Sequence, residues 1–359
     1  MNSKLQTILI FEPLSGGHRA NFIGWLKAAV PEHPGCRFVF FTAADVEVPL
    51  SQQLASAGHW KKQMLLYRLF RQACKKHKPD QALVLELTHL ELPLALFGSP
   101  VPLSAILFVQ YPELPRGLKF FSKHWKTRLL LWRAPVRNLF LLNGEKSCLF
   151  LKDHFGSRTR FVPLADPAPD VPAASGFSLN VPEGKRACLF FGAASRRKGA
   201  GILLDALARI SPETAEQNAY LFCGEPEPEY RAEFSRACEW LRSSRPDIDL
   251  VIETRFVSNE QMMAMFEQAG LILMPYTRSE YSSGILALAA KAGTPVLGPK
   301  GGLLGRLIVE NGLGLAAKLT PEVLELSVGL NEELRQKFVG HNTIENFTKP
   351  ILDAICHES

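Results

Sequence analysis

The sequence lacks the usual marks of a disulfide-linked, zinc-binding or membrane-spanning protein. Its seven cysteines form no Cys-x-x-Cys pair, which favours reduced, buried thiols and argues against a zinc site. No apolar run reaches the roughly 18–20 residues that a membrane-spanning helix needs. The nearest, ALVLELTHLELPLALFG, is interrupted by Glu86, His89 and Glu91. The first residues, MNSKLQTILIFEP, are typical of a first β-strand rather than of a cleavable leader.

Two partner classes also lack support. There is no Gly-x-Gly-x-x-Gly fingerprint, so we expect no dinucleotide cofactor. The net charge is +6, and residues 1–170 hold 22 Lys and Arg against 12 Asp and Glu. This basic half favours an anionic surface as a partner. Nucleic acid is not expected, because no recognised binding module accompanies the charge.

Short apolar runs alternate with helical patterns along the whole chain. Strands are predicted at 7–11, 36–42, 81–87, 102–110 and 138–143, and again at 187–192, 219–224, 248–256, 271–275 and 294–298. Strands that alternate with helices indicate parallel sheets covered on both faces. In such folds ligands bind at the carboxyl ends of the strands.

A proline-rich stretch with little periodicity, residues 163–184, divides the pattern. We therefore expect an N-terminal Rossmann-like domain at 1–170 and a C-terminal one at 171–340. A helical tail, 341–359, is expected to pack back on the N-terminal domain. Two facing domains of this kind place a ligand in the cleft between them.

The stretch PYTRSEYSSGILALAAKAGTPVLG, 275–298, has the order strand, loop, helix and strand. Ser282, Ser283 and Gly284 precede the helix. Because the first turn of a helix has unpaired N–H groups and partial positive charge, a phosphate could bind there. The alternative is that one serine merely caps the helix.

A second candidate site lies in LFFGAASRRKGAGILLDAL. A strand ends at Gly192, and Arg196, Arg197 and Lys198 lead into the next helix. Arg can hold a diphosphate through two hydrogen bonds, and Lys acts as a point charge. The alternative is a solvated basic turn.

A third element is EPLSGGHRANF. Gly16 and Gly17 follow the first strand and allow a ligand to approach the backbone, while His18 could donate or shuttle a proton. A lone Gly-Gly turn is weak evidence by itself.

Together these elements resemble the nucleotide-sugar-binding domain of the retaining glycosyltransferases of family 4, which have the two-domain GT-B fold. The resemblance runs through LFFGAASRRKGAGILLDAL, LFCGEPEPEYRAEF and TRFVSNEQMMAMFEQAGLILMPYTRSEYSSGILALAAKAGTPVLGPKGGLLGRLIVENGLG, and covers most of 187–314. The first half matches more loosely, through SGGH, LELTH and FVQYPE. The resemblance implies two facing doubly wound domains with a C-terminal helix returning to the first.

The family pattern has two Glu residues separated by seven others. The first falls on Glu280, which the resemblance implies contacts the donor sugar. The second, which usually holds the nucleotide ribose, falls on Leu288, so this sequence departs there. Lys198 matches the family lysine before Gly, whereas the usual arginine falls near Ala193 and would be replaced by Arg196 or Arg197.

The family histidine of the N-terminal domain falls on Gln110, a second departure. His89 or His18 could serve nearby, and the sequence does not choose between them. The resemblance implies catalytic roles for Glu280, Lys198, Arg197 and His89. Gly16, Gly17, His18, Gly192, Arg196, Ser282, Ser283 and Gly284 are the candidate donor-binding residues.

The implied reaction moves a sugar from a nucleotide diphosphate, with UDP- or GDP-sugar as the expected donor, to a glycan or glycolipid acceptor, with retention and without a metal ion. No cofactor is expected beyond the donor substrate. Preorganised cations and N–H groups would stabilise the charge that develops on the leaving diphosphate. Such an enzyme would serve surface polysaccharide or glycolipid synthesis.

Residues 61–78 and 116–137 each carry seven Lys and Arg and no acid, and the second segment adds Phe120, Phe121, Trp125 and Trp132. Basic residues with aromatics on a helix favour docking on an anionic membrane, and hence a cytoplasmic protein peripheral at the inner face. The alternative is a solvated basic helix face. Two other functions stay open: a non-catalytic binding subunit, and a sugar-nucleotide epimerase of the same fold, which needs more acids and histidines.

Overall fold

The computed structural model describes residues 5–15, 18–46, 58–111, 117–156, 158–255 and 257–356. The chain divides into two compact units. Unit 1 comprises residues 1–166 and 344–359, and unit 2 comprises residues 167–343. Each unit is built on one parallel sheet, as the alternating apolar pattern predicts. Each sheet has six strands, one more than the five expected from the sequence, because the sequence pattern does not predict the last strand of each sheet.

The sheet of unit 1 has the strand order β2-β1-β3-β4-β5-β6. Its strands are β1 (Gln6–Glu12), β2 (Cys36–Thr42), β3 (Gln81–Val84), β4 (Leu103–Leu107), β5 (Val136–Leu142) and β6 (Arg160–Leu164). The helices are α1 (His18–Ala29), α3 (His59–His77), α4 (Glu91–Phe97), α5 (Leu118–Arg133) and α6 (Glu145–Phe155), with the 3-10 turns η1 (Val30–Glu32), η2 (Ala43–Asp45) and η3 (Leu87–His89).

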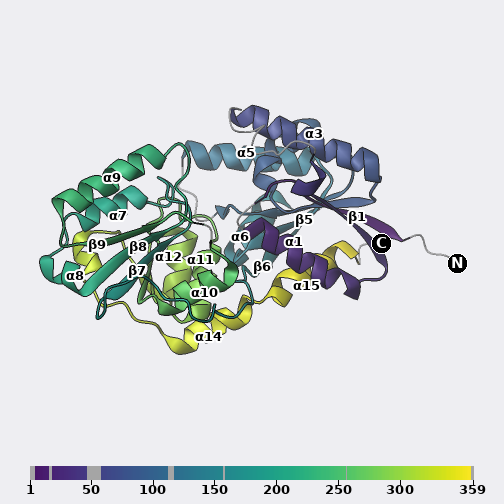
Figure 1. Ribbon diagram of the computed structural model, residues 1–359. Helices are drawn as coiled ribbons and strands as arrows, with labels where there is room; N and C mark the ends of the chain where they lie inside the picture. Colours follow the sequence, from purple (N-terminus) through teal and green to yellow (C-terminus); the bar gives the residue numbers. More distant parts are fainter. Residues whose placement is uncertain are drawn as a thin grey trace. The chain divides into compact units, whose positions relative to one another are not determined.

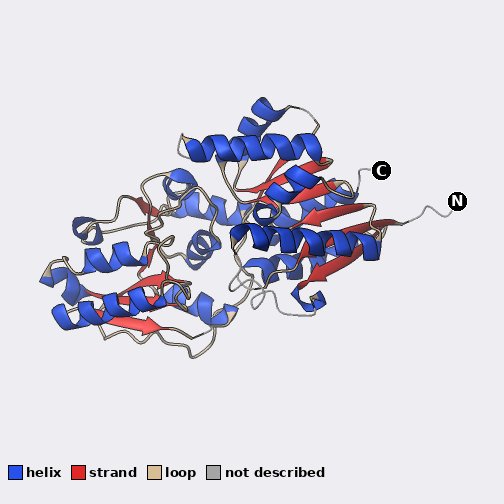
Figure 2. Cartoon of the chain, turned by 90° about the horizontal axis from the view of Figure 1, so that it is seen from above, coloured by secondary structure: helices blue, strands red, loops and turns tan. Residues whose placement is uncertain are grey.

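Strand β1 lies inside this sheet, and its side chains are buried on both faces. Ile8, Leu9, Ile10 and Phe11 are each at most 1% exposed, although successive side chains point to opposite faces. Figure 2 shows helices on both sides of these strands. A continuous apolar run, rather than an alternating one, is the sequence signature of such a doubly covered strand.

The last helix of the chain, α15 (Ile344–Cys356), belongs to unit 1. It lies beside α1, where the rings of Phe22 and Phe347 are 4.4 Å apart (Figure 1). The Gln81 side chain donates a hydrogen bond to the carbonyl of Ile355, and the Cys356 thiol contacts Cys36 on β2. The expected return of the C-terminal helix to the N-terminal part of the chain is confirmed.

The sheet of unit 2 has the order β12-β11-β10-β7-β8-β9. Its strands are β7 (Arg186–Phe191), β8 (Asn218–Cys223), β9 (Asp249–Glu253), β10 (Leu271–Leu273), β11 (Val296–Gly298) and β12 (Gly314–Ala316). The helices are α7 (Ala200–Leu207), α8 (Pro212–Gln217), α9 (Arg231–Ser244), α10 (Asn259–Gln268), α11 (Gly284–Ala292), α12 (Gly302–Glu310), α13 (Pro321–Leu324) and α14 (Glu332–His341).

Residues of β7 alternate between two apolar cores. Ala187 and Leu189 pack in one, and Cys188 and Phe190 pack in the other. Both faces of this sheet are therefore covered as well. A capping box begins α10: Gln261 N–H donates to Ser258 Oγ at 3.2 Å, and Ser258 N–H donates to the Gln261 side chain at 3.1 Å.

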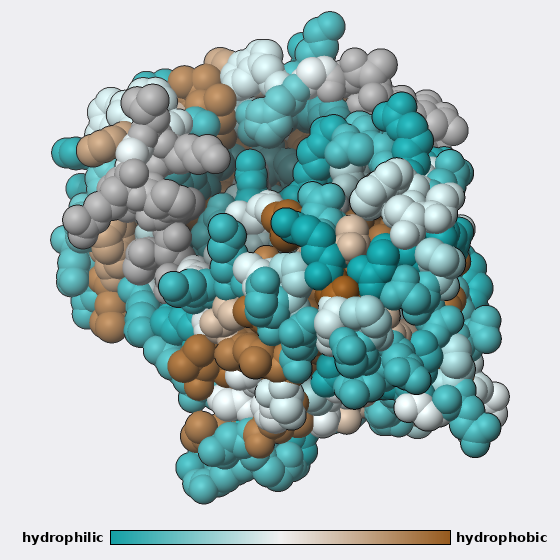
Figure 3. Space-filling model, turned by 90° about the vertical axis from the view of Figure 1, so that its left-hand side faces the viewer, coloured by the Kyte–Doolittle hydropathy of each residue, from teal (hydrophilic) through white to brown (hydrophobic). Residues whose placement is uncertain are grey.

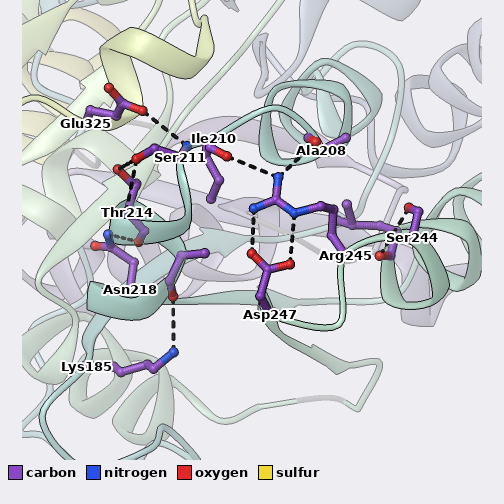
Figure 4. A network of polar contacts seen from close by, with 12 residues as sticks. Lys185, Ala208, Ile210, Ser211, Thr214, Asn218, Ser244, Arg245, Asp247 and Glu325 are labelled. Atoms are coloured by element: carbon purple, nitrogen blue, oxygen red, sulfur yellow. Dashed lines mark hydrogen bonds and ion pairs between the residues drawn. The ribbon is translucent and has the colours of Figure 1, made fainter.

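A polar network links the segment before β9 to the segment after α7 in unit 2 (Figure 4). Arg245 donates to the carbonyls of Ala208 and Ile210 at 3.0 and 3.1 Å, and its guanidinium grips Asp247 at 2.9 and 2.6 Å. These carbonyls follow the end of α7, so one cation satisfies backbone acceptors that the helix leaves open.

The molecular surface is mostly hydrophilic on the face drawn in Figure 3, where apolar side chains gather in separate patches. Within the described residues, no helix is long and apolar enough to cross a bilayer.

Candidate functional site

Two loops of unit 2 meet where neighbouring strands β7 and β10 end. The Thr277 N–H donates to the carbonyl of Arg197 at 3.0 Å, and the Thr277 hydroxyl donates to the same carbonyl at 3.1 Å. Gly199 has a φ of +74°, and a Cβ there would collide with the backbone of Pro275. A glycine is therefore required for the basic turn to approach the loop that leads to Glu280.

Lys198 is held at the end of β7. Its Nζ donates to the carbonyl of Phe191 at 3.2 Å and lies 5.8 Å from the centre of the Tyr276 ring. Gly192, with a φ of +93°, leaves the room that the ammonium occupies, since a Cβ there would collide with Nζ. This ammonium is fixed at the carboxyl edge of the sheet, where a parallel α/β sheet binds ligands.

The two arginines of the turn point to different partners. Arg196 forms an ion pair with Glu233 on α9, and its guanidinium lies 5.5 Å from the centre of the Tyr230 ring. Arg197 is exposed, and its positive charge acts to lower the pKa of the nearby Tyr281 phenol. Since Arg196 already has an anionic partner, Arg197 is the better candidate to replace the family arginine.

The loop before α11 carries the remaining donor-site candidates. Burial, then the charge of Glu280, raises the pKa of the Tyr281 phenol, while Arg278 opposes this through its charge and a hydrogen bond. Ser283 is the N-cap of α11, but its hydroxyl makes no capping hydrogen bond. A Cβ on Gly284 would meet nothing within 4 Å, so the helix start is open. Open N–H groups at this end suit an anion.

Leu288 lies in the second turn of α11, where residues 286–290 are all buried. It is 2% exposed and belongs to the apolar core of unit 2. The position that carries a glutamate in the family pattern is therefore a packing position in this chain. A leucine at this position cannot give the ribose the hydrogen bond of the family's glutamate.

The corresponding edge of unit 1 carries a different set of groups. Arg19 on α1 donates to Glu86 through Nε at 2.9 Å and also through Nη2, and its Nε lies 3.6 Å from Glu12. His89 Nε2 lies 3.3 Å from the other oxygen of Glu86. We call Glu12, Arg19, Glu86 and His89 the unit 1 cluster. It places two carboxylates against one guanidinium and one imidazole.

The two carboxyl groups of this cluster have opposite electrostatics. Burial raises the pKa of Glu12 to about 7, against the opposing charge of Arg19. Burial also acts to raise the pKa of Glu86, but the hydrogen bond from His89 and the charge of Arg19 lower it to about 2. At neutral pH, Glu86 is ionised and Glu12 is poised between its two protonation states.

The three sequence candidates near this edge have different outcomes. Gly16 and Gly17 lie outside the described residues. His18 begins α1, and its ring lies 4.9 Å from that of Phe108. Burial of the ring, then the charge of Arg19, lowers the pKa of His18. A neutral imidazole can accept or donate one hydrogen bond.

Gln110, which replaces the family histidine, is buried at 1% exposure. Its amide nitrogen donates to the carbonyl of Leu142 at 2.9 Å, while Oε1 has no partner in the described part of the chain. This side chain fixes the backbone after β5 rather than presenting an imidazole.

Among the described residues, no group of three His, Cys, Asp or Glu side chains could hold a metal ion. One Asp-x-Asp triplet, Asp247 to Asp249, has the spacing of a metal-binding motif. Asp247 binds Arg245, however, and Asp249 lies 2.6 Å from Lys185, at the start of β9. The triplet braces unit 2 at the edge opposite to the ligand-binding one.

Sequence reasoning did not select Glu12, Arg19 or Glu86. The available signal was the position of both glutamates directly after apolar strand runs, ILIFE and LVLE. Charged residues at strand ends are candidates for a site in a parallel sheet. Their mutual contact could not be read, because the pairing of β1 with β3 joins segments some seventy residues apart.

Comparison with known proteins supports the fold. No model of a known family matches the chain, and no curated protein matches its sequence. Among solved structures, WaaG, a glycosyltransferase involved in lipopolysaccharide biosynthesis, is 15% identical with a TM-score of 0.65, and the match covers 98% of this chain and 100% of WaaG. An α,α-trehalose-phosphate synthase (UDP-forming) from Burkholderia vietnamiensis is 12% identical with a TM-score of 0.67, covering 99% and 100%.

A putative UDP-N-acetylglucosamine 2-epimerase from Listeria monocytogenes is 12% identical with a TM-score of 0.61, covering 98% of this chain and 96% of its own. At these identities the likeness defines the fold class alone, and that class is the GT-B fold of glycosyltransferases and their relatives. Membership of family 4 stays a prediction.

Proposed function

We propose that this chain is a glycosyltransferase that moves a sugar from a nucleotide diphosphate donor to a glycan or glycolipid acceptor, with retention and without a metal ion. Unit 2 binds the donor. The leading support is Lys198, whose ammonium is fixed at the end of β7, beside the loop that leads into the open N-terminus of α11. A fixed cation and open N–H groups suit a leaving diphosphate.

Arg197 adds a second cation to the proposed diphosphate site, and Glu280 orients the sugar hydroxyls. Ser282, Ser283 and Gly284 line the helix end. Leu288 leaves the ribose without the family's carboxylate, a loss of about 1.5–3 kcal/mol of donor binding for one charged hydrogen bond. We infer that the nucleotide, UDP or GDP, is held mainly through its phosphates.

The donor site is tested with a panel of UDP-, GDP-, ADP- and TDP-sugars. Thermal shift measures binding, and release of nucleoside diphosphate measures turnover. Lys198→Ala is expected to lower turnover about 10²–10³-fold, the range for a lost transition-state donor. Glu280→Ala is expected to weaken donor binding.

Lys291→Ala is the matched control for these variants. Lys291 is also a lysine of unit 2, but it sits at the opposite end of α11, where its Nζ binds Asp170 at 2.7 Å. Its replacement should leave donor binding and turnover unchanged. A Lys198→Ala protein with wild-type binding and turnover would remove the proposed site.

A membrane-facing role of α5 supports a lipid-linked acceptor. Phe121, Trp125 and Trp132 are 68%, 57% and 74% exposed and, with Arg128, recur at spacings of four, three and four along one helix face. Aromatic rings with an interleaved cation are typical of an interfacial helix. With this face as the docking surface, we infer a cytoplasmic protein that is peripheral at the membrane.

Lys123 does not belong to that face. Its ammonium is paired with the buried carboxylate of Glu91, which also accepts a hydrogen bond from Thr127 at 2.8 Å. Arg133 donates to the carbonyl of Leu96 at 2.9 Å. Of the α5 cations whose side chains the structure describes, Lys126 and Arg128 are therefore the ones available to anionic lipid.

Co-sedimentation with vesicles of phosphatidylglycerol and phosphatidylcholine tests docking. Replacing Trp125 and Trp132 by Ala is expected to lower the bound fraction while leaving thermal stability nearly unchanged, because both rings are exposed. Replacing exposed Trp240 of α9 by Ala is the control. Equal binding of all three proteins would show that α5 is only a solvated face.

A second candidate function is a sugar-nucleotide epimerase. It is favoured by the unit 1 cluster, which supplies the acids and the histidine that proton transfer requires, and by the likeness to the Listeria structure. Incubation of each donor in D₂O separates the two: an epimerase incorporates deuterium into the sugar without acceptor, whereas a transferase does not. A non-catalytic binding subunit would bind a donor without turnover.

A further inference from the structure

One carboxyl oxygen of Glu12, Oε2, has no hydrogen-bond partner among the described residues. Its Oε1 accepts a hydrogen bond from Leu14 N–H at 3.1 Å and faces Arg19. No group in the described part of the chain hydrogen-bonds Oε2, although the side chain is only 3% exposed. Oε2 is not fully cut off from water, so it can accept a hydrogen bond from a group that enters from solvent.

The surroundings of this carboxyl define what it can bind. Glu12, Glu86 and His89 line a hollow of about 10 Å³ whose other walls include Leu14, Leu66 and Leu90. The hollow holds no more than one water-sized group. Because the cluster has two carboxyl groups for one guanidinium, it disfavours a phosphate and suits a small, neutral hydrogen-bond donor, such as a hydroxyl.

We infer that the unit 1 cluster binds the hydroxyl group of the sugar acceptor, and that Glu12 receives the proton of that hydroxyl during transfer. This inference rests on the proposed function and adds the acceptor chemistry to it. Arg19 and His89 are positioning residues. Both bind the carboxylate of Glu86, and this pairing holds the Arg19 guanidinium beside Glu12.

The step balances as follows. The acceptor O–H bond breaks, and its proton moves to the Glu12 carboxylate. The freed oxygen electron pair forms the new bond to the anomeric carbon, while the bond from that carbon to the diphosphate oxygen breaks and its electrons leave with the nucleoside diphosphate. Glu12 then returns the proton to solvent. The balance holds for either configuration of the product.

The electrostatics agree with this assignment. The groups that face Glu12 are Arg19 on α1, Glu86 and His89 in the segment after β3, and apolar Leu66 on α3. Burial raises the pKa of Glu12 to about 7, close to the optimum for a proton acceptor at neutral pH. Transfer should therefore rise with pH up to about 7 and then level off.

Glu12→Gln is the decisive variant, because the amide keeps the shape and cannot take the proton. The probes are the nucleotide sugar that stabilises the wild type and octyl glucoside, galactoside and N-acetylglucosaminide as acceptors. Transfer and donor hydrolysis are expected to fall about 10²–10⁴-fold, and the rise below pH 7 should disappear. The thermal shift caused by nucleoside diphosphate should remain. Glu12→Asp, which retains a carboxyl group, should keep a pH-dependent rate.

Glu91→Gln controls for the loss of a buried carboxylate, since Glu91 is also in unit 1 but pairs with Lys123. It should keep the wild-type pH profile. Wild-type rates and pH dependence in Glu12→Gln would overturn the inference. If that variant fails to fold, loss of the pH-dependent rate in Glu12→Asp would overturn it.

Saturation-transfer NMR with the octyl glycosides needs no donor and separates the two proposals. Signals present in the wild type and lost in Glu12→Gln support the acceptor site even if no nucleotide sugar binds, in which case the donor proposal alone fails. Equal signals in both proteins, or none in the wild type, would overturn the acceptor site.

Discussion

The two units share one architecture and differ in chemistry at the same structural place. Each has a parallel six-stranded sheet whose inner strands are buried on both faces. At the carboxyl edge of unit 2, Lys198 and Arg197 supply cations beside an open helix start. At the corresponding edge of unit 1, Glu12 and Glu86 surround a single Arg19. The fold selects the place of a site, and the residues at the strand ends select its ligand.

This difference also explains where each unit tolerates charge. The cations of unit 2 lie on exposed or half-buried loops, where water still solvates them. The carboxyl of Glu12 is buried, so its ionisation costs free energy that the Lys198 ammonium does not incur to the same degree.

Leu288→Glu should give unit 2 a buried carboxylate, as Glu12 gives unit 1, and so remove this difference between the units. Leu288 is 2% exposed in an apolar core, so an unpaired charge there should lower the free energy of unfolding by about 3–5 kcal/mol. Chemical denaturation measures the loss. Leu288→Met is the control and should lose less than about 1.5 kcal/mol. Tighter nucleotide binding by the glutamate variant, with normal stability, would show instead that residue 288 faces the ribose.

Glu12→Gln should sharpen the contrast through the pH dependence of stability. Burial raises the pKa of Glu12 from 4.5 to about 7, so the folded protein binds more protons than the unfolded chain between these values. The contribution of Glu12 to the free energy of unfolding therefore falls as pH rises from about 4.5 to about 7, by roughly 3 kcal/mol in total. The glutamine variant should lose this slope.

Urea unfolding at pH 5, 6, 7 and 8 measures that slope for the wild type and the variant. Glu86 does not interfere, since its pKa of about 2 makes its stabilisation fall only below pH 4.5. If the free energy of unfolding changed with pH in parallel for the two proteins, Glu12 would be solvated and its pKa would not be raised by burial.

Arg245→Ala should have the smallest effect and mark a cation of unit 2 with a structural role only. Arg245 binds two carbonyls and Asp247 at the edge away from Lys198. Its loss is expected to cost about 1–3 kcal/mol of stability and to leave nucleotide binding unchanged. Thermal shift with and without the donor measures both. A loss of donor binding would extend the donor site to the Asp-x-Asp triplet.

The sequence predicts the fold well because the deciding signals are local. Alternating strands and helices predict both parallel sheets, and the proline-rich stretch at 163–184 predicts the division into two parts. Those patterns depend on residues within one strand, helix or loop. The helical tail expected at 341–359 is likewise a local pattern, and α15 begins there at Ile344.

The candidate sites depend on contacts between distant segments, which the sequence does not specify. Whether Arg196 or Arg197 is available depends on Glu233 in the following helix. Lys123 appears as one more surface cation until its pairing with Glu91 is known. Leu288 lies in a helix, GILALAAKA, that has no distinct polar face. The sequence therefore does not show whether the residue 288 side chain faces a ligand or the core.

The position of α15 has a consequence for how the protein is made. Unit 2 is one continuous segment, whereas unit 1 needs residues 344–356, which are translated after unit 2. Until then Phe22, buried to 1% in the finished protein, lacks its partner Phe347. Domains usually fold in the order of synthesis; here unit 1, most of which is translated first, is completed only after unit 2 has been translated.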